Sequence, residues 1–332
     1  MVGKKLLALS SILVSMSLFV GCAGSGTGST NEGKAVNIGI TQIASHPALD
    51  ASREGFLEAL ADKGYKKGEN LNIELQNAEG DIATAQLIAT NFTSSKKDLI
   101  FAIATPAAQV AFNTTKDIPI IVTAVTDAKE AGLVQSNEKS GTNVAGTSDA
   151  VPIEQQVKLI RDLFKDAKTI GVLYNTSEVN SEIQVNDLKE AAKANGFEVV
   201  TKGITSVNDI SQALDAILGS VDVLYTPADN LVASSMAIIA AQATQKKVPV
   251  VGAEEAHVQN GALITEGISY KKLGYEAGLM AVQVLEGSNI SELPVKKSEE
   301  TQLVINEDTM NKLGITIDQS IMERATLIKG GE

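Results

Sequence analysis

Two short turns of the same composition are the segments of this chain best suited to bind a charged ligand. Thr105-Pro106-Ala107 follows the apolar run Leu99–Ala104, and Thr226-Pro227-Ala228 follows Val221–Tyr225. A helix that starts at Thr105 leaves backbone N–H groups and a hydroxyl that can bind an anion, although the hydroxyl can equally cap the helix. Asp229, after the second turn, can bind a cation by charge-assisted hydrogen bonds or cap the next helix.

Further candidates lie in the loops that follow other strand-like runs. His46 precedes Pro47 in the first such loop and either faces a ligand or braces the loop. Acids other than Asp229 are secondary candidates, since each taken singly is explained as a capping or solvated group. Tyr225 and Tyr270 can stack on an aromatic ligand or belong to the core. His257 has no companion residue and receives no role. The remaining candidates are Thr41, Gln42, Thr123, Thr126, Asp127, Asn175, Glu178, Asn230 and Glu254.

Signatures of catalysis and of metal binding are missing from the sequence. Neither a Gly-x-Ser-x-Gly elbow nor a His-Glu-x-x-His motif occurs, and no pair of acids follows a glycosidase pattern. Two histidines and one cysteine cannot build a typical zinc site. Gly28, Gly33 and Lys34 match the spacing of a phosphate loop, but Ala35 replaces the residue that binds magnesium. We expect no catalysis, no metal and no cofactor.

The charge of the chain argues against nucleic acid as a partner. Its 332 residues include 28 Lys and Arg against 40 Asp and Glu, a formal charge of −12. An acidic chain without a basic run lacks the positive surface that phosphate backbones require.

The N-terminus is typical of an exported lipoprotein. Lys4 and Lys5 precede the apolar stretch Leu6–Val20, which is shorter than the ~20 residues of a spanning helix. Cys22 follows in a sequence that resembles a bacterial lipobox; the alternative is an ordinary signal with a chance cysteine. We expect a signal peptide over 1–21 and a lipid on Cys22. Residues 22–34 then form a Gly/Ser/Thr-rich flexible tether.

From residue 35 onward, strand-like and helix-like segments alternate. Nearly all-apolar strands that alternate with helices predict parallel sheets covered on both faces. About ten strands are too many for one ordinary sheet, so we predict an α/β protein with two doubly wound lobes. The predicted strands are Val36–Ile40, Leu71–Leu75, Leu99–Ala104, Ile118–Val125, Thr169–Tyr174, Glu198–Ile204, Val221–Tyr225 and Val248–Gly252. The predicted helices are Ala48–Gly64, Ile82–Phe92, Ala107–Phe112, Ser181–Ala194, Ile210–Leu218 and Val232–Ala243.

An internal repeat supports the division into two lobes. Each Thr-Pro-Ala turn is followed by a helix and then by a strand that opens with proline, at Pro119 and at Pro249. Because ligands bind beyond the carboxyl ends of parallel strands, two facing lobes would place both turns at one shared cleft.

Several motifs resemble the ABC-transporter substrate-binding proteins of the tryptophan/tyrosine-binding family, over about residues 35–315. They include His46-Pro47-Ala48-Leu49-Asp50, Ala104-Thr105-Pro106-Ala107-Ala108-Gln109, Val125-Thr126-Asp127, Gly132-Leu133-Val134, Tyr174-Asn175, Glu178, Asn180-Ser181, Asp229-Asn230 and Gly267–Gly274. The resemblance implies a type I periplasmic-binding-protein fold with a three-segment hinge. The expected lobes are 35–148 plus 270–287 and 149–269 plus 288–332.

The resemblance also implies a free amino acid as ligand, aromatic by family. Its carboxylate would bind at Thr105, Pro106 and Ala107, and its ammonium at Asp229. The implied partners are the membrane subunits of an ABC permease, and we expect a monomer. The protein would be anchored to the outer face of the cytoplasmic membrane in a Gram-positive cell, or be periplasmic. The alternative is a nucleoside- or sugar-binding lipoprotein of the same fold, which would need more aromatic residues than this Trp-free chain provides.

Overall fold

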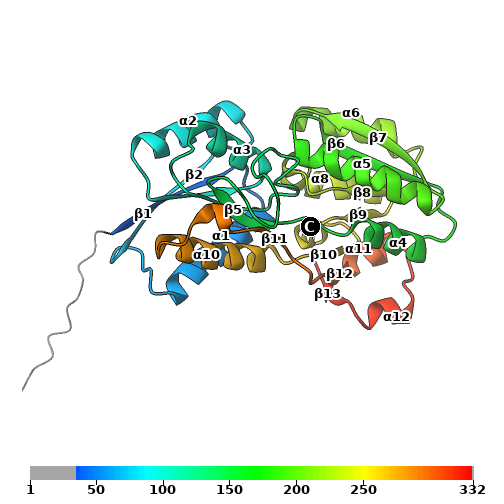
Figure 1. Cartoon of the computed structure of the whole chain (residues 1–332). Coiled ribbons are helices and arrows are strands. Elements are labelled where there is room, and N and C mark those ends of the chain that lie inside the picture. The colour runs from blue at the N-terminus through cyan, green and yellow to red at the C-terminus, as the bar shows by residue number, and fades with distance from the viewer. Residues whose placement is uncertain (1–34, 331–332) are drawn as a thin grey trace, which may run out of the picture. The chain divides into compact units, whose positions relative to one another are not determined.

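The computed structural model describes residues 35–330, so the predicted signal peptide, Cys22 and the tether lie outside the described residues. Within these residues two sheets form two lobes, as the alternation predicts. The N-terminal lobe holds a sheet in the order β11-β5-β4-β3-β1-β2, with α1 and α10 on one face and α2 and α3 on the other (Figure 1). Its elements are β1 (Val36–Gln42), α1 (Pro47–Asp62), β2 (Leu71–Asn77), α2 (Ile82–Ser94), β3 (Leu99–Ile103), α3 (Thr105–Thr114), β4 (Ile120–Thr123), β5 (Val144–Ser148), α10 (Tyr270–Leu285), η2 (Ile290–Glu292) and β11 (Val295–Lys297).

The C-terminal lobe holds a sheet in the order β13-β12-β10-β9-β8-β6-β7, in which only β12 runs antiparallel to its neighbour β10. Its two faces bury two separate apolar clusters, one under α4 and α5 and one under α6 and α8. Its elements are α4 (Ile153–Leu163), β6 (Thr169–Asn175), α5 (Val179–Ala194), β7 (Glu198–Ile204), η1 (Val207–Asp209), α6 (Ile210–Ile217), β8 (Val223–Thr226), α7 (Asn230–Ser234), α8 (Met236–Gln245), β9 (Val250–Gly252), α9 (Glu255–Gln259), β10 (Ile264–Gly267), β12 (Gln302–Asn306), α11 (Glu307–Leu313), α12 (Gln319–Met322) and β13 (Thr326–Ile328).

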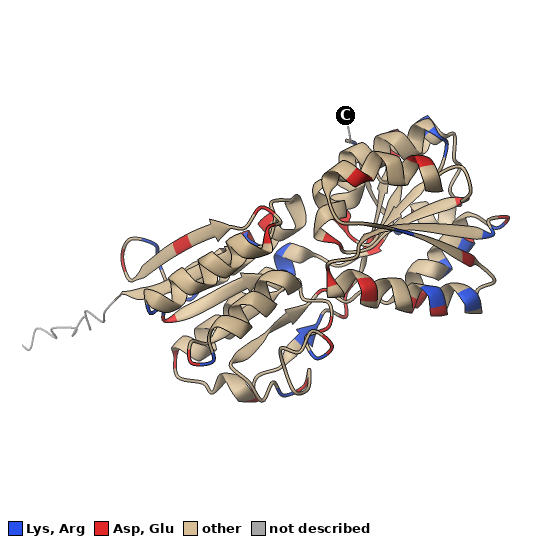
Figure 2. Ribbon diagram, turned by 90° about the horizontal axis from the view of Figure 1, so that it is seen from above, with Lys and Arg blue, Asp and Glu red and all other residues tan. Residues whose placement is uncertain are grey.

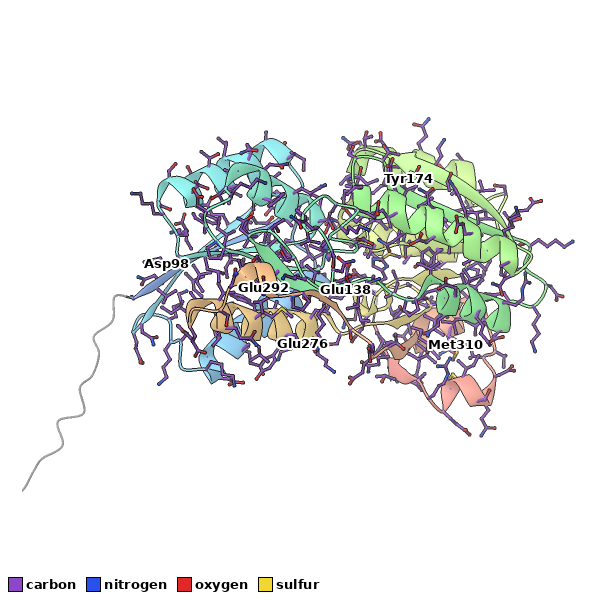
Figure 3. All side chains as sticks on the ribbon, viewed as in Figure 1. Asp98, Glu138, Tyr174, Glu276, Glu292 and Met310 are labelled. Carbon is purple, nitrogen blue, oxygen red and sulfur yellow. The ribbon has the colours of Figure 1, made fainter. Side chains whose placement is uncertain are left out.

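The chain crosses between the lobes three times, but the third crossing corrects our boundary at residue 287. β11 pairs with β5 in the N-terminal sheet, and Lys139 forms an ion pair of 2.6 Å with Glu292. Glu292 and Glu276 both lie in the N-terminal lobe, whereas Met310 lies in the C-terminal lobe (Figure 3). A three-residue edge strand with two lysines has no apolar pattern by which the sequence could assign it.

The sequence pattern locates most of the strands but misses short or weakly apolar elements. The elements that were not predicted are β5, β10, β11, β12, β13, α4, α9, α11, α12 and the longer α10. The single helix expected over Val232–Ala243 is two helices that meet at Ser235. The two prolines of the internal repeat occupy equivalent places in the two sheets. Pro119 and Pro249 each accept a hydrogen bond through their carbonyl from the neighbouring strand, at Ile100 and Leu224.

Helices α1 and α10 approach each other closely because glycines line their contact. A Cβ on Gly274 would lie 1.8 Å from the carbonyl oxygen of Ser52, and one on Gly55 would lie 2.0 Å from that of Lys271. The hydroxyl of Ser52 also donates to the carbonyl of Tyr270 at 3.1 Å. This packing holds the start of α10, at Tyr270, against the start of α1, which follows His46.

Within residues 35–330, no helix is both long enough and apolar enough to span a membrane.

Candidate functional site

The carboxyl ends of strands from both sheets meet in a cleft between the lobes. Its outer part is a cavity of about 450 Å³, of a size that holds small molecules. The N-terminal lobe contributes the loops after β1 and β2 together with Pro106, and the C-terminal lobe contributes the loops after β6, β7 and β8. The apolar part of the lining is formed by Ile43, Ala44, Ile82, Ala83, Pro106, Val207 and Leu231.

Deeper in the cleft, among buried residues, lies a small space of about 10 Å³, which suffices for about one water molecule. Four of the buried polar groups around it are acidic or imidazole side chains from both lobes. Where the two lobes meet, the ribbon of Figure 2 carries several acidic positions. The space is lined by His46, Leu49, Ala124, Asp149, Asn180, Ala228, Asp229, Asn230, Glu254 and Tyr270.

Asp229 acts as a helix cap, which is one of the two roles that the sequence allows. Its carboxylate accepts hydrogen bonds from the backbone N–H of Asn175 at 2.5 Å and of Val232 at 2.9 Å. The hydroxyl of Ser181 adds a third at 2.7 Å. Burial, with a contribution from Glu178, raises the pKa of Asp229 to about 7. Because both oxygens are already occupied, Asp229 is a poor partner for a ligand ammonium.

Glu178 organises the polar loops of the C-terminal lobe. It accepts hydrogen bonds from the side-chain amides of Asn175 at 3.0 Å, Asn180 at 3.2 Å and Asn230 at 2.5 Å. Asn230 in turn lies 3.4 Å from Nε2 of His46, and this contact links the C-terminal lobe to the N-terminal one. Glu178 therefore fixes the amides that line the cleft.

Glu254 is the buried acid with the fewest partners at the cleft. It stands at the N-cap of α9 without capping it, and its Oε1 has no hydrogen-bond partner in the structure. That oxygen lies 4.0 Å from Nδ1 of His46 and 3.3 Å from Nε2 of His257. Burial raises the pKa of Glu254 to about 8. Burial also lowers the pKa of His46 to about 4 and that of His257 to about 3.

Asp149 and Tyr270 form a second buried pair beside Glu254, at two of the interlobe crossings. The hydroxyl of Tyr270 donates to Asp149 at 2.8 Å, and the hydroxyl of Thr126 donates to the other carboxylate oxygen at 3.0 Å. Burial raises the pKa of Asp149. Thr126 thus supports an acid of the cleft, while Thr123 contacts the hydroxyl of Thr147 at 2.9 Å.

The turn at Thr105 fits an anion site better than a plain cap. α3 begins at Thr105 itself, and its N-cap position is Ala104, which has a φ of 79° that residues with a Cβ rarely adopt. The hydroxyl of Thr105 therefore does not cap the helix; it is buried without a hydrogen-bond partner. Ala108 donates the first backbone bond of the helix, to Ala104, so the N–H groups of Thr105 and Ala107 precede it.

The remaining candidates from the sequence lie apart from the buried polar residues around the inner space. Tyr225 lies in the apolar core of the C-terminal lobe, which supports a structural role rather than stacking on a ligand. Gln42 is held by Asp50 and Arg53 of α1, and Thr41 is buried on β1. Asp127 caps a turn at Lys129 and Glu130 and lines a separate cavity.

Three residues of the cluster were missed by the sequence reasoning. Our statement that His257 has no companion is wrong, because it contacts Glu254 and its Nδ1 lies 3.0 Å from the hydroxyl of Thr226. Asp149 and Asn180 also line the inner space. The signal for Asp149 was available, since it follows directly on the first interlobe crossing; His257 lies one turn after Glu254 on an unpredicted short helix.

Comparison with known proteins places nearly the whole described chain in one family. Residues 37–329 match the model of the ABC transporter substrate binding protein family. The chain is 50% identical over 318 residues to a tyrosine-binding protein of Clostridioides difficile, covering 93% of this chain and 92% of that protein.

Two solved structures superpose on this one with different closeness. A Streptococcus pneumoniae ABC domain in complex with L-Trp, 37% identical, has a TM-score of 0.86 over 89% of this chain and 99% of that one. A ligand-free, open substrate binding protein with adhesive properties from Clostridium difficile is 52% identical, yet its TM-score is only 0.69 over 89% and 100%. This structure is therefore closer to the complex than to the open form, although its sequence is closer to the latter.

Proposed function

The chain belongs to the ABC transporter substrate-binding proteins, a family of binding proteins rather than enzymes, and from that premise we propose that it captures a free aromatic amino acid for import. The ligand would lie between the lobes and stabilise their closed arrangement by contacting both of them. The greater likeness to the L-Trp complex than to the open structure supports this arrangement.

Unpartnered buried polar atoms in both lobes carry the proposal: the hydroxyl of Thr105, next to the cavity-lining Pro106, and Oε1 of Glu254, beside the inner space. Thr105 and the free N–H groups of α3 would bind the ligand carboxylate. Glu254, rather than Asp229, would bind the ammonium, because Glu254 has a free oxygen and Asp229 has none. The amides of Asn175 and Asn230 complete the polar end.

The outer cavity would hold the side chain of the ligand. Its volume of about 450 Å³ exceeds what any amino-acid side chain requires, and apolar residues of both lobes form much of its wall. An aromatic ring placed there would bury apolar surface, at about 25 cal/mol for each Å² removed from water.

Delivery and anchoring belong to the same proposal. The family membership supports docking of the closed form on an ABC permease. A lipid on Cys22 would keep the protein at the outer membrane face. Replacing Cys22 by Ala should release the protein from the membrane fraction into the soluble fraction; unchanged membrane association would contradict the anchor.

A thermal-shift panel of the twenty amino acids, nucleosides and sugars tests the ligand class. A ligand at about 100 times its Kd adds ~2.7 kcal/mol to the free energy of unfolding, a shift of several degrees in Tm. We expect shifts with tyrosine, tryptophan or phenylalanine. A shift with nucleosides or sugars alone would overturn the amino-acid assignment and keep the family.

A further inference from the structure

Three buried atoms without hydrogen-bond partners converge beside the inner space. They are Oε1 of Glu254, Nδ1 of His46 and Nε2 of His257. Their side chains are 2%, 4% and 0% exposed, and the two imidazole nitrogens lie 4.0 and 3.3 Å from the carboxylate oxygen. Unpartnered buried polar atoms are uncommon, and the 3.3 Å between Oε1 of Glu254 and Nε2 of His257 leaves room for a shared proton but for no further atom.

A charged Glu254 would be poorly supported in this place. Within residues 35–330 the only basic side chains that contact Glu254 are the two histidines, and burial keeps both of them neutral near pH 7. In the part of the chain that the structure describes, the hydroxyl of Tyr270 is the one donor near Glu254, and it only partly offsets the rise in the pKa of Glu254 that burial causes. A buried carboxylate with no cation and so few donors takes up a proton instead of remaining charged. If Nδ1 of His257 donates to Thr226, at 3.0 Å, then Nε2 is free to accept that proton from Glu254.

The other titratable groups that face Glu254 do not supply a positive charge. Asp149 and Tyr270 lie beside it, joined to each other by the hydrogen bond of 2.8 Å. Asp229, in the next loop, adds negative charge and so disfavours ionisation of Glu254 further. Every charge that these neighbours can carry is negative, so a cation entering the inner space would be strongly favoured.

We propose that Glu254 is an exchange site, in which the ammonium group of the ligand replaces a proton that Glu254 holds in the ligand-free protein. This inference rests on the proposed amino-acid binding and extends it. The proton leaves Glu254 for the solvent, the carboxylate becomes charged, and an N–H of the ammonium donates to the freed oxygen. Glu254 thereby selects amino acids against analogues that lack the amino group.

Two consequences distinguish this exchange from simple ion pairing. Binding of an amino acid near pH 6.5 releases about one proton, and its affinity rises about tenfold per pH unit from pH 5.5 to 7.5. An analogue with a hydroxyl in place of the amino group, such as indole-3-lactate, releases no proton, because it brings no cation to replace it.

Isothermal titration of the purified protein at pH 6.5, in buffers of different ionisation enthalpy, measures the proton count directly. L-tryptophan and L-tyrosine are the probes, with indole-3-lactate as the matched analogue. Glu254→Gln keeps the shape and neutrality of the protonated acid; we expect it to bind more weakly, to release no proton and to lose the pH dependence.

Asp229→Asn and Asp149→Asn are the control variants, since each neighbouring acid is another conceivable source of the proton. Each substitution also removes a negative charge that raises the pKa of Glu254, so both variants should still release a proton on binding, but less of it than the unchanged protein. If Glu254→Gln does not bind measurably, these two variants decide: residual release in both supports Glu254, and complete loss in either overturns the proposal.

The outcomes separate this inference from the function on which it rests. Binding of tryptophan or tyrosine to the unchanged protein without proton release refutes the exchange and leaves amino-acid binding intact. Release that persists in Glu254→Gln also refutes it. No binding of any amino acid by the folded protein removes the proposed function and the exchange with it.

Discussion

The ligand-free protein should become less stable than its Glu254→Gln variant as the pH rises. Burial raises the pKa of Glu254 to about 8 in the folded protein, whereas an unfolded glutamate has a pKa of about 4.3. Between these values the folded chain holds a proton that the unfolded chain has lost. Unfolding then releases a proton, so the free energy of unfolding falls with increasing pH.

The size of the effect follows from the width of that pH window. One proton of difference changes the free energy of unfolding by about 1.4 kcal/mol per pH unit. From pH 5.5 to 7.5 the unchanged protein should therefore lose about 3 kcal/mol relative to the variant, with the difference levelling off above about pH 8. Glutamine cannot ionise, so the variant lacks this component.

Urea unfolding of both proteins at pH 5.5, 6.5 and 7.5 measures the difference. Other groups with shifted pKa values, including Asp149, Asp229 and the two histidines, are present in both proteins, and their contributions largely cancel. Parallel stability curves, with a constant difference at all three values, would refute the conclusion that Glu254 is protonated in the folded state.

Three further substitutions test the site and its support. Thr105→Val should weaken amino-acid binding about fivefold and leave Tm nearly unchanged, because its hydroxyl caps nothing in the structure; a loss below about threefold in a binding titration would remove Thr105 from the site. Asp229→Ala should lower the free energy of unfolding by about 2 kcal/mol or more in urea, since three donors lose their acceptor, and an unchanged midpoint would contradict the capping role. Gly274→Ala should destabilise the protein by about 1–3 kcal/mol in the same assay, because its Cβ would lie 1.8 Å from the backbone of Ser52. Gly219→Ala, where nothing lies within 4 Å, is its matched control, and equal effects of the two glycine substitutions would contradict the close packing of α1 and α10.

Most of the fold could be predicted from the sequence because its strands are buried on both faces. Runs such as Leu99–Ile103 are apolar throughout, and the proline-led strands after Pro119 and Pro249 repeat in both lobes. The short edge strand β11 could not be found in this way. Nor could the break between α7 and α8 at Ser235, where no glycine marks the end of a helix. Their placement depends on tertiary contacts, as in the pairing of β11 with β5.

The sequence predicts which types of residue line the candidate site, but it does not predict the role of each one. Four polar residues occupy N-cap positions at the cleft, namely His46, Glu178, Asp229 and Glu254, and the sequence cannot tell a capping side chain from one that faces a ligand. In the structure Asp229 alone of the four caps its helix. That difference depends on which donors the neighbouring loops supply, so it required the fold.

Fluorescence titration with L-tryptophan tests the central claim most directly. The protein contains no Trp, so tyrosine is its own strongest emitter and bound indole is observed almost without background. Transfer of the indole into the cleft should shift its emission to shorter wavelength in a saturable way, and L-tyrosine should reverse the shift by competition while nucleosides and sugars should not. The account of an aromatic amino-acid-binding cleft would be contradicted by two results together. The folded protein would leave the emission spectrum of tryptophan unchanged, and neither tyrosine nor phenylalanine would raise its Tm.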